Sequence, residues 1–277
     1  MRYGVTMFAT DRSMPVHELA VEAEVRGFDS IYIPEHTHIP VSRKTAPPTG
    51  DAELKEEYKR TLDPLVALAA AAALTTTIRL GTGVMLPAQR EPIVTAKAIA
   101  TLQNLSNGRF CFGVGFGWNE DEMNSHGVDY RTRRAHMRDH MLTMRSLWRD
   151  EVAAYEGTYS HLAESWAWPK PQTEVPVLLG GGAGPKLFAH IAEYGHGWIP
   201  IGGAGLTENI ATFRQAMTEA GRNPDDMEIV PFGSIPSPEK LDHFEHIGVT
   251  ECVFRVPSAG RDEVLVTLDE QAALIAG

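Results

Sequence analysis

The sequence predicts an α/β protein of the TIM (β/α)8 barrel class, a ring of parallel strands with helices outside it. Short apolar runs of buried-strand type alternate with segments of helical length and periodicity, and several of these runs end in glycine. The chain has 277 residues with 43% apolar content, and a barrel of about 250 residues forms one domain. We therefore expect a single domain over 1–277, with a doubly wound α/β sheet as the structural alternative.

Each predicted element is marked by its apolar pattern or by the residues that begin and end it. The predicted strands are, in chain order, 3–8, 28–33, 78–84, 109–115, 177–179, 197–200, 228–232 and 251–256. The predicted helices are 16–26, 63–74, 92–105, 131–148, 185–193, 206–220, 238–247 and 262–275. Gly27 is predicted to cap the first helix, and Pro185 opens a later helix directly after Gly184.

The stretch 78–115 gives the clearest βαβ signal. Two apolar runs, IRLGTGV and RFCFGVG, end in glycines and flank a segment of helical periodicity. Glycine at the carboxyl end of a parallel strand lets a flat ligand lie against the backbone, at the end where α/β barrels place their sites. Farther along, Met137, Met141, Met144 and Trp148 recur at helical spacing, which predicts core packing.

A long polar segment, 34–60, separates the second strand from the next helix. It contains Pro47, Pro48 and Gly50 and then a run of charged residues. This composition predicts a loop insertion after strand two, which is a candidate lid over the site.

Composition excludes several classes of partner. The formal net charge is −11, whereas a nucleic-acid surface needs a basic stripe. No apolar segment has the length of a membrane span, and the first residues, MRYGVTMF, lack the apolar region of a signal peptide. Cys111 and Cys252 lie in apolar runs without CxxC spacing and are predicted to be buried free thiols. We expect a cytoplasmic protein that binds neither nucleic acid nor membrane.

The second strand is followed directly by Glu35, His36, Thr37 and His38. A histidine at the carboxyl end of a barrel strand is placed for acid–base chemistry near neutral pH, so His36 is a candidate catalytic residue. The spacing of His36 and His38 also permits an alternative from another class, a metal-dependent TIM-barrel hydrolase. No later predicted strand ends in a histidine or aspartate that would complete the ligand set, so no metal is predicted.

The turn between the fifth strand and its helix reads Gly180, Gly181, Gly182, Ala183 and Gly184. Free N–H groups at a helix N-terminus attract anions, and glycines let a phosphate approach the backbone, which predicts a phosphate site here. The glycines of 113–117 do not form a dinucleotide fingerprint, because they follow the fourth strand and do not open directly into a helix.

Four motifs together resemble those of the bacterial luciferase-like flavin and deazaflavin oxidoreductases. They are EH after strand two, GTGV after strand three, GVGxGW after strand four and GGGxG after strand five, in the family's order. The resemblance covers most of the chain and implies the barrel fold. It also implies that Thr82, Gly83 and Val84 back the cofactor ring, with a non-prolyl cis peptide at Gly83–Val84.

The resemblance assigns further residues to the site. Glu35 and His36 would contact the cofactor, with His36 also catalytic. Gly117, Trp118 and Asn119 would lie beside the cofactor and substrate, Trp118 as an aromatic wall of the catalytic site and Asn119 as a polar contact. The turn 180–184 would hold the cofactor's phosphate.

The implied activity is hydride transfer between coenzyme F420 and a small organic substrate that the sequence does not identify. F420 is preferred because the chain is short and its pattern is most similar to the actinobacterial deazaflavin branch. Arg131 or Arg134 would then help to neutralise the carboxylate tail of F420. An FMN-dependent monooxygenase is the alternative within the family, and a non-catalytic small-molecule binding protein is another. The resemblance also implies a homodimer.

Overall fold

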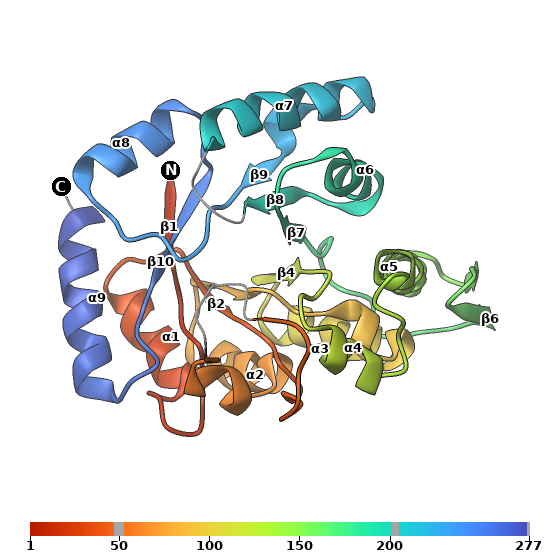
Figure 1. Ribbon diagram of the computed structural model, residues 1–277, viewed down its shortest axis with the longest axis horizontal. Coiled ribbons are helices and arrows are strands. Elements are labelled where there is room, and N and C mark those ends of the chain that lie inside the picture. Colours follow the sequence, from red (N-terminus) through yellow and green to blue (C-terminus); the bar gives the residue numbers. More distant parts are fainter. Residues whose placement is uncertain (47–52, 201–204, 276–277) are drawn as a thin grey trace.

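The computed structural model describes residues 1–46, 53–200 and 205–275 (Figure 1). Its strands are β1 (Arg2–Thr6), β2 (Ser30–Ile33), β3 (Arg79–Thr82), β4 (Phe110–Val114), β5 (Ala153–Glu156), β6 (His161–Ser165), β7 (Val177–Gly181), β8 (Gly197–Pro200), β9 (Glu228–Ile229) and β10 (Glu251–Arg255). Its α-helices are α1 (Val16–Val25), α2 (Pro64–Leu74), α3 (Pro92–Leu105), α4 (Glu120–Ser125), α5 (Arg133–Arg149), α6 (Pro185–Tyr194), α7 (Leu206–Glu219), α8 (Pro238–His246) and α9 (Arg261–Ile275). Three short 3-10 helices are η1 (Glu56–Arg60), η2 (Pro87–Gln89) and η3 (Pro224–Asp226). The loop residues Pro47, Pro48 and Gly50 lie outside the described ranges.

An eight-stranded sheet in the order β10, β1, β2, β3, β4, β7, β8, β9 forms the barrel, and all of its pairs are parallel. The ring closes beside β9 and β10, where the Thr250 N–H donates to Ile229 O at 3.0 Å and the Ser234 N–H donates to Val253 O at 3.1 Å. The helices lie outside this ring (Figure 1). The predicted TIM barrel is confirmed, and the doubly wound alternative is wrong because an open sheet leaves two unpaired edges.

Side chains from β2, β4, β7, β8 and β10, and from the residue after β9, pack in the barrel interior. A small inner cluster holds Tyr32, Cys111, Leu178, Ile199, Val230 and Val253. Cys111 and Cys252 are buried free thiols, as predicted, and burial raises the pKa of the Cys111 thiol to about 12. The predicted core packing of α5 is also confirmed, since Met137, Met141 and Met144 are each 0% exposed.

The structure departs from the predicted elements at several places. The antiparallel hairpin of β5 and β6 was not predicted; it packs on α5, where Asp139 accepts from the Tyr155 hydroxyl at 2.8 Å and from the Tyr159 N–H at 2.8 Å. The short helix α4 was also missed, and α5 begins at Arg133 rather than at 131. The strand predicted at 228–232 ends early, as Pro231 has no N–H to continue the ladder.

The helix ends follow the sequence closely. Helix α3 has the predicted bounds, and α6 begins at Pro185 after Gly184 at the N-cap. At the end of α1 the C-cap is Arg26, and Gly27 is the next residue, with a φ of 82° that suits glycine.

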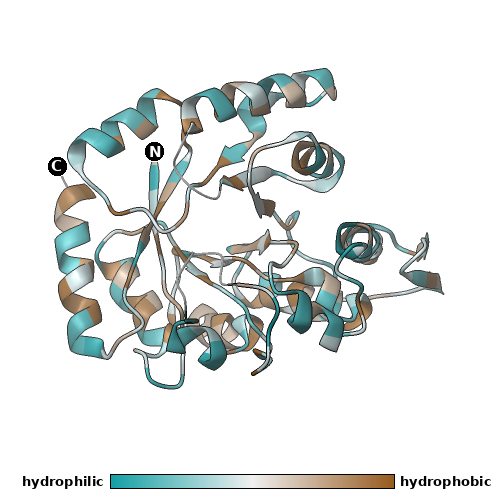
Figure 2. Ribbon diagram, viewed as in Figure 1, coloured by the Kyte–Doolittle hydropathy of each residue, from teal (hydrophilic) through white to brown (hydrophobic). Residues whose placement is uncertain are grey.

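The outer helices mix hydrophilic and hydrophobic residues, as α7, α8 and α9 show in Figure 2. None of the helices within the described ranges is both long and apolar enough to cross a bilayer. The cytoplasmic location stays a prediction.

Candidate active site

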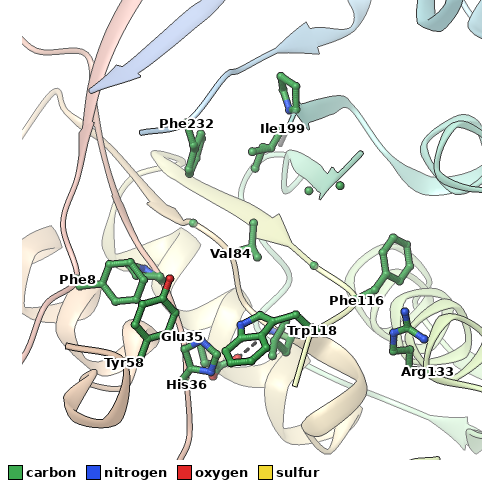
Figure 3. Close-up of a pocket in the computed structure, with 18 of the residues that line it drawn as sticks. Phe8, Glu35, His36, Tyr58, Val84, Phe116, Trp118, Arg133, Ile199 and Phe232 are labelled. Atoms are coloured by element: carbon green, nitrogen blue, oxygen red, sulfur yellow. Dashed lines mark hydrogen bonds between the residues drawn. The ribbon is translucent and has the colours of Figure 1, made fainter. Parts of the chain in front are cut away.

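A cavity of about 480 Å³ lies at the carboxyl ends of the barrel strands. Its walls come from the segments that end or follow β1, β2, β3, β4, β7, β8 and β9, together with η1 and the start of α5 (Figure 3). This is the end of a TIM barrel that carries enzyme active sites.

The structure brings eight of the predicted site residues to this cavity. They are Glu35, His36, Gly83, Val84, Gly117, Trp118, Gly180 and Gly181. The other predicted residues, Thr82, Asn119, Gly182, Ala183 and Gly184, are not among its lining residues.

His36 is held by a buried carboxylate that the sequence analysis did not identify. Its Nδ1 lies 2.8 Å from Oε2 of Glu122, and the two side chains are 7% and 1% exposed. The backbone of His36 is fixed as well, since its N–H donates to Thr61 Oγ1 at 3.1 Å. The imidazole therefore has a defined orientation at the cavity wall.

Aromatic rings surround His36 on the cavity side. The ring centroid of His36 lies 5.4 Å from that of Tyr58 and 5.8 Å from that of Trp118. Phe8 extends the same wall, with its ring 4.7 Å from Tyr58 (Figure 3). Because Tyr58 belongs to η1, the described part of the loop insertion supplies one wall of the site.

Glu35 lines the cavity, but its carboxylate is bonded within the protein. It accepts from the Leu86 N–H at 2.8 Å and from Arg90 Nε at 2.7 Å, and Arg90 also contacts Asp63. Burial raises the pKa of the Glu35 carboxyl, and Arg90 opposes that rise. Glu35 thus ties the end of β2 to the turn after β3, and its contact with a cofactor stays a prediction.

The turn after β3 has the backbone that the resemblance implied. The peptide Gly83–Val84 is cis, so that expectation is confirmed. A Cβ on Gly83 would meet Phe232 at 2.4 Å, which explains the glycine at this close approach. Val84 points into the cavity (Figure 3). The side chain of Thr82 does not, since it is fully buried and donates to Gly113 O at 2.6 Å.

Asn119 caps a helix and does not line the cavity. Its Oδ1 accepts from the Glu122 N–H at 3.3 Å at the start of α4, and its side chain is 2% exposed. The contact predicted between Asn119 and a cofactor stays a prediction, and Asn119 Nδ2 is buried without a hydrogen-bond partner in the described residues.

The glycine-rich turn runs from the cavity to the N-terminus of α6. Gly180 and Gly181 line the cavity, and no side chain caps the helix at Gly184. A Cβ built on Gly182 or Gly184 would have no atom of the described residues within 4 Å. The turn therefore presents uncapped N–H groups beside open space, which suits an anion.

Arg133 and Arg134 bring positive charge to the cavity wall. The guanidinium of Arg134 lies 3.9 Å above the Phe116 ring, and that of Arg133 lies 3.6 Å above the Tyr130 ring. Within the described ranges neither forms an ion pair, and each has a buried nitrogen, Nε of Arg133 and Nη1 of Arg134, without a hydrogen-bond partner. Burial lowers the pKa of Arg134, and adjacent Arg133 lowers it further, but a guanidinium stays charged at neutral pH.

Of the two arginines suggested by sequence, only Arg134 lies at the cavity. Arg131 pairs with Asp129 at 2.9 Å and its side chain is 87% exposed. Arg133 was missed because the sequence does not reveal which side of a helix faces a cavity. Farther along α5, Arg138 pairs with Glu193 as a surface salt bridge.

The described ranges 1–46, 53–200 and 205–275 contain no group of three or more His, Cys, Asp and Glu side chains that could hold a metal ion. His36 is paired with Glu122, whereas His38 is exposed and contacts Thr37. The described residues therefore do not provide the metal ligands that the alternative, a metal-dependent hydrolase, would need.

Known sequences match this chain over most of its length. The sequence model of the family described as luciferase-like monooxygenase matches residues 8–239. An uncharacterized protein of Mycobacterium tuberculosis (strain ATCC 25618 / H37Rv) is 43% identical over 280 residues, which cover 100% of this chain and 99% of that protein. An F420-dependent glucose-6-phosphate dehydrogenase of Kineococcus radiotolerans is 30% identical over 209 residues, which cover 73% of this chain and 56% of that protein.

Solved structures share the fold at low sequence identity. An F420-dependent secondary alcohol dehydrogenase in complex with an F420–acetone adduct has a TM-score of 0.80 at 20% identity, covering 99% of this chain and 98% of that chain. A type II Baeyer–Villiger monooxygenase from Pseudomonas putida in complex with FMN has a TM-score of 0.62 at 19% identity, covering 88% of this chain and 70% of that chain. The same barrel fold therefore occurs in a protein described as F420-dependent and in one described in complex with FMN.

Proposed function

Because the chain belongs to the luciferase-like monooxygenase family and is an oxidoreductase of that family, we propose that it uses coenzyme F420 to oxidise an alcohol or to reduce the corresponding carbonyl compound. The observation that carries this proposal is the cavity that joins His36 at one wall to Arg133 and Arg134 at another. The glucose-6-phosphate dehydrogenase relative, named as F420-dependent, supports the choice of cofactor.

The residues at the cavity fit such a cofactor. Val84 and the backbone of Gly83 offer a flat surface for a ring, and open space at Gly182 leaves room for a phosphate. An anionic tail would pair with the guanidinium groups of Arg133 and Arg134, which line the cavity. Thr82, Ala183 and Gly184 would contact the cofactor through their backbone atoms alone.

When bound, F420 supplies the hydride acceptor or donor. The chain supplies the proton chemistry and the dry pocket. Nδ1 of His36 is engaged by Glu122, so Nε2 is the nitrogen left for a substrate hydroxyl. Phe8, Tyr58 and Trp118 exclude water from this corner, which strengthens the hydrogen bond to the substrate.

The arginine pair favours F420 over FMN. Both cofactors carry a phosphate that the turn 180–184 suits, but only the tail of F420 continues into carboxylates. Two cations without acidic partners among the described residues match that longer anion. The FMN-dependent monooxygenase remains the alternative within the family, and in it the aromatic walls would exclude water from the site.

We expect Arg134→Met to weaken F420 binding about tenfold to a hundredfold, since a hydrogen bond to a charged group contributes about 1.5–3 kcal/mol. Methionine keeps an apolar contact with Phe116. The phosphate-free deazaflavin core should bind native and variant proteins equally, because it lacks the tail. Calorimetric titration with both ligands measures the difference.

Arg131→Met is the matched control for that experiment, since Arg131 is exposed and pairs with Asp129. An equal loss of affinity for the tailed and tailless ligands would contradict the tail site. An unchanged affinity of the Arg134→Met variant for F420 would also contradict the tail site.

The substrate side of the cavity favours an uncharged, largely apolar alcohol. Nearby cations are already paired, Arg90 with Glu35 and Arg255 with Glu57 at 3.1 Å. At these two cations a sugar phosphate would have to compete with the carboxylates of Glu35 and Glu57. Glucose 6-phosphate, the substrate in the relative's name, is therefore not expected to react.

Anaerobic turnover tests the proposed function. The protein is mixed with oxidised F420 and either secondary alcohols of increasing apolar size or glucose 6-phosphate, and the loss of the deazaflavin absorbance is followed. Reduction with an apolar alcohol is expected. Oxygen-dependent turnover with reduced FMN, and none with F420, would overturn the proposal.

We also propose that the protein is a homodimer formed through α2 and α3. These helices pack side by side and expose large apolar side chains to solvent, with Val66 73% and Val94 68% exposed. Trp166, which is 78% exposed, lies in the segment after β6 that borders α3. Exposed apolar surface of this kind marks a contact between proteins.

Val66→Lys combined with Val94→Lys is expected to convert the dimer into a monomer, because two charges per subunit would be buried without partners. Light scattering after gel filtration gives the mass directly. Val266→Lys on α9 is the control, since Val266 is also exposed, at 58%. A monomeric native protein would contradict the dimer.

A further inference from the structure

We propose that Glu122 is the positioning residue for His36, holding the proton on Nδ1 so that Nε2 is free to take a proton from the substrate. This inference rests on the proposed function, in which His36 handles the substrate proton. Glu122 was not part of the site expected from sequence, and none of the relatives' names points to it.

The carboxylate of Glu122 contacts His36 in a buried position. Its Oε2 lies 2.8 Å from Nδ1 of His36, its side chain is 1% exposed, and its Oε1 is buried without a hydrogen-bond partner in the described residues. If Glu122 is ionised, its oxygens only accept hydrogen bonds, and the hydrogen of this contact is then on Nδ1. The imidazole is then in the tautomer whose Nε2 has a lone pair.

Helix α4 brings the carboxylate into place. Asn119 caps the helix and accepts from the Glu122 N–H at 3.3 Å, which fixes the first turn. From that turn Glu122 reaches the loop after β2, 86 positions back in the chain. A carboxylate and an imidazole from two separate strand ends therefore meet behind the cavity wall.

A simple tether between α4 and the loop does not explain this pair. Other contacts already join the two segments: Asp121 accepts from the Lys44 N–H at 2.7 Å, Thr45 Oγ1 accepts from the Glu120 N–H at 3.3 Å, and Thr37 contacts His126 at 2.7 Å. These contacts are exposed, whereas Glu122 is buried. Burying a carboxylate costs free energy unless a charge offsets it, so a tether would be made more favourably at the surface.

The pair has a direct chemical consequence. When the substrate hydroxyl gives its proton to Nε2, the O–H electron pair stays on the substrate oxygen and His36 becomes an imidazolium. The negative charge of Glu122, in contact with Nδ1, offsets the new positive charge in a site that water does not screen. Of the other titratable groups near this joint, His38, His126 and Glu120 are exposed and Asp121 is partly exposed. Glu35 and Tyr58 are buried, and the Tyr58 ring lies 5.4 Å from that of His36.

The test is ¹⁵N NMR of the imidazoles in the protein without cofactor, with the His36 signals assigned by their loss in His36→Gln. In the native protein Nδ1 should be protonated and Nε2 unprotonated at pH 7.5. Glu122→Gln should move both signals, and kcat should fall about 10²-fold while Kd for F420 stays within about threefold. Glu122→Asp, which keeps the charge, should recover part of the lost turnover.

Asp121→Asn is the matched control, because it removes the charge of a carboxylate that contacts the loop from the same helix turn. It should leave the His36 signals unchanged and kcat within about threefold. A native His36 protonated on Nε2 would overturn the proposal without any variant, as would Glu122→Gln with unchanged signals and turnover. The NMR measurement needs no cofactor. It therefore tests the role of Glu122 even if the assignment of F420 is wrong.

Discussion

His36→Ala is expected to lower kcat by about 10²-fold or more while leaving the affinity for F420 within about tenfold. The variant removes the nitrogen that takes or gives the substrate proton, and it also leaves Glu122 buried without its partner at 2.8 Å. The cofactor surface at Val84 and the turn 180–184 is untouched. Turnover is followed by deazaflavin absorbance and affinity by fluorescence titration.

The control for this experiment is His38→Ala. His38 lies two positions farther along the same loop, but its side chain is exposed and contacts Thr37 at 3.1 Å. It should keep kcat within about twofold of the native value. Full activity in His36→Ala would remove His36 from the mechanism, and equal losses in both variants would point to loop disorder instead.

Gly182→Asp is expected to weaken F420 binding by about tenfold to a thousandfold. The substitution places a carboxylate beside the proposed phosphate, and two like charges about 4 Å apart repel by about 1 kcal/mol in water and about 4 kcal/mol in a partly buried site. The turn also loses its positive potential at the start of α6. Titration with F420 at two salt concentrations measures the loss and its electrostatic part.

Gly182→Ala separates charge from shape at this position. A Cβ on Gly182 meets no atom of the described part of the chain within 4 Å, so alanine should fit and leave the affinity within about threefold. If the folded Asp variant binds F420 as well as the native protein does, the phosphate is not at this turn. A loss in the Ala variant equal to that in the Asp variant would argue for a steric cause.

The barrel could be predicted because each central strand is marked locally. The runs that became β3 and β4 are short, apolar and ended by glycine, and α3 has the predicted bounds. The βαβ order then follows from the alternation of elements, since parallel strands need helical crossovers. The single-domain organisation stays a prediction.

Parts of the site depended on pairings that no local pattern encodes. Asn119 followed by acidic residues is a helix start, and this signal for α4 was available in the sequence. The contact between Glu122 and His36 could not be predicted from the sequence, because it joins residues that follow two different strands. Arg133 faces the cavity while Arg131 does not, and this depends on the rotation of α5 about its axis.

The measurement that tests the central claim most directly is parallel titration of the cofactor-free protein with F420 and with FMN. Quenching of tryptophan fluorescence reports binding, since Trp118 lines the cavity. We predict F420 binding at micromolar Kd or tighter, with FMN at least about tenfold weaker because it lacks the carboxylates that Arg133 and Arg134 would hold. Tight binding of FMN with none of F420 would contradict the assignment and identify a flavin monooxygenase, and binding of neither would leave the cavity without the proposed cofactor.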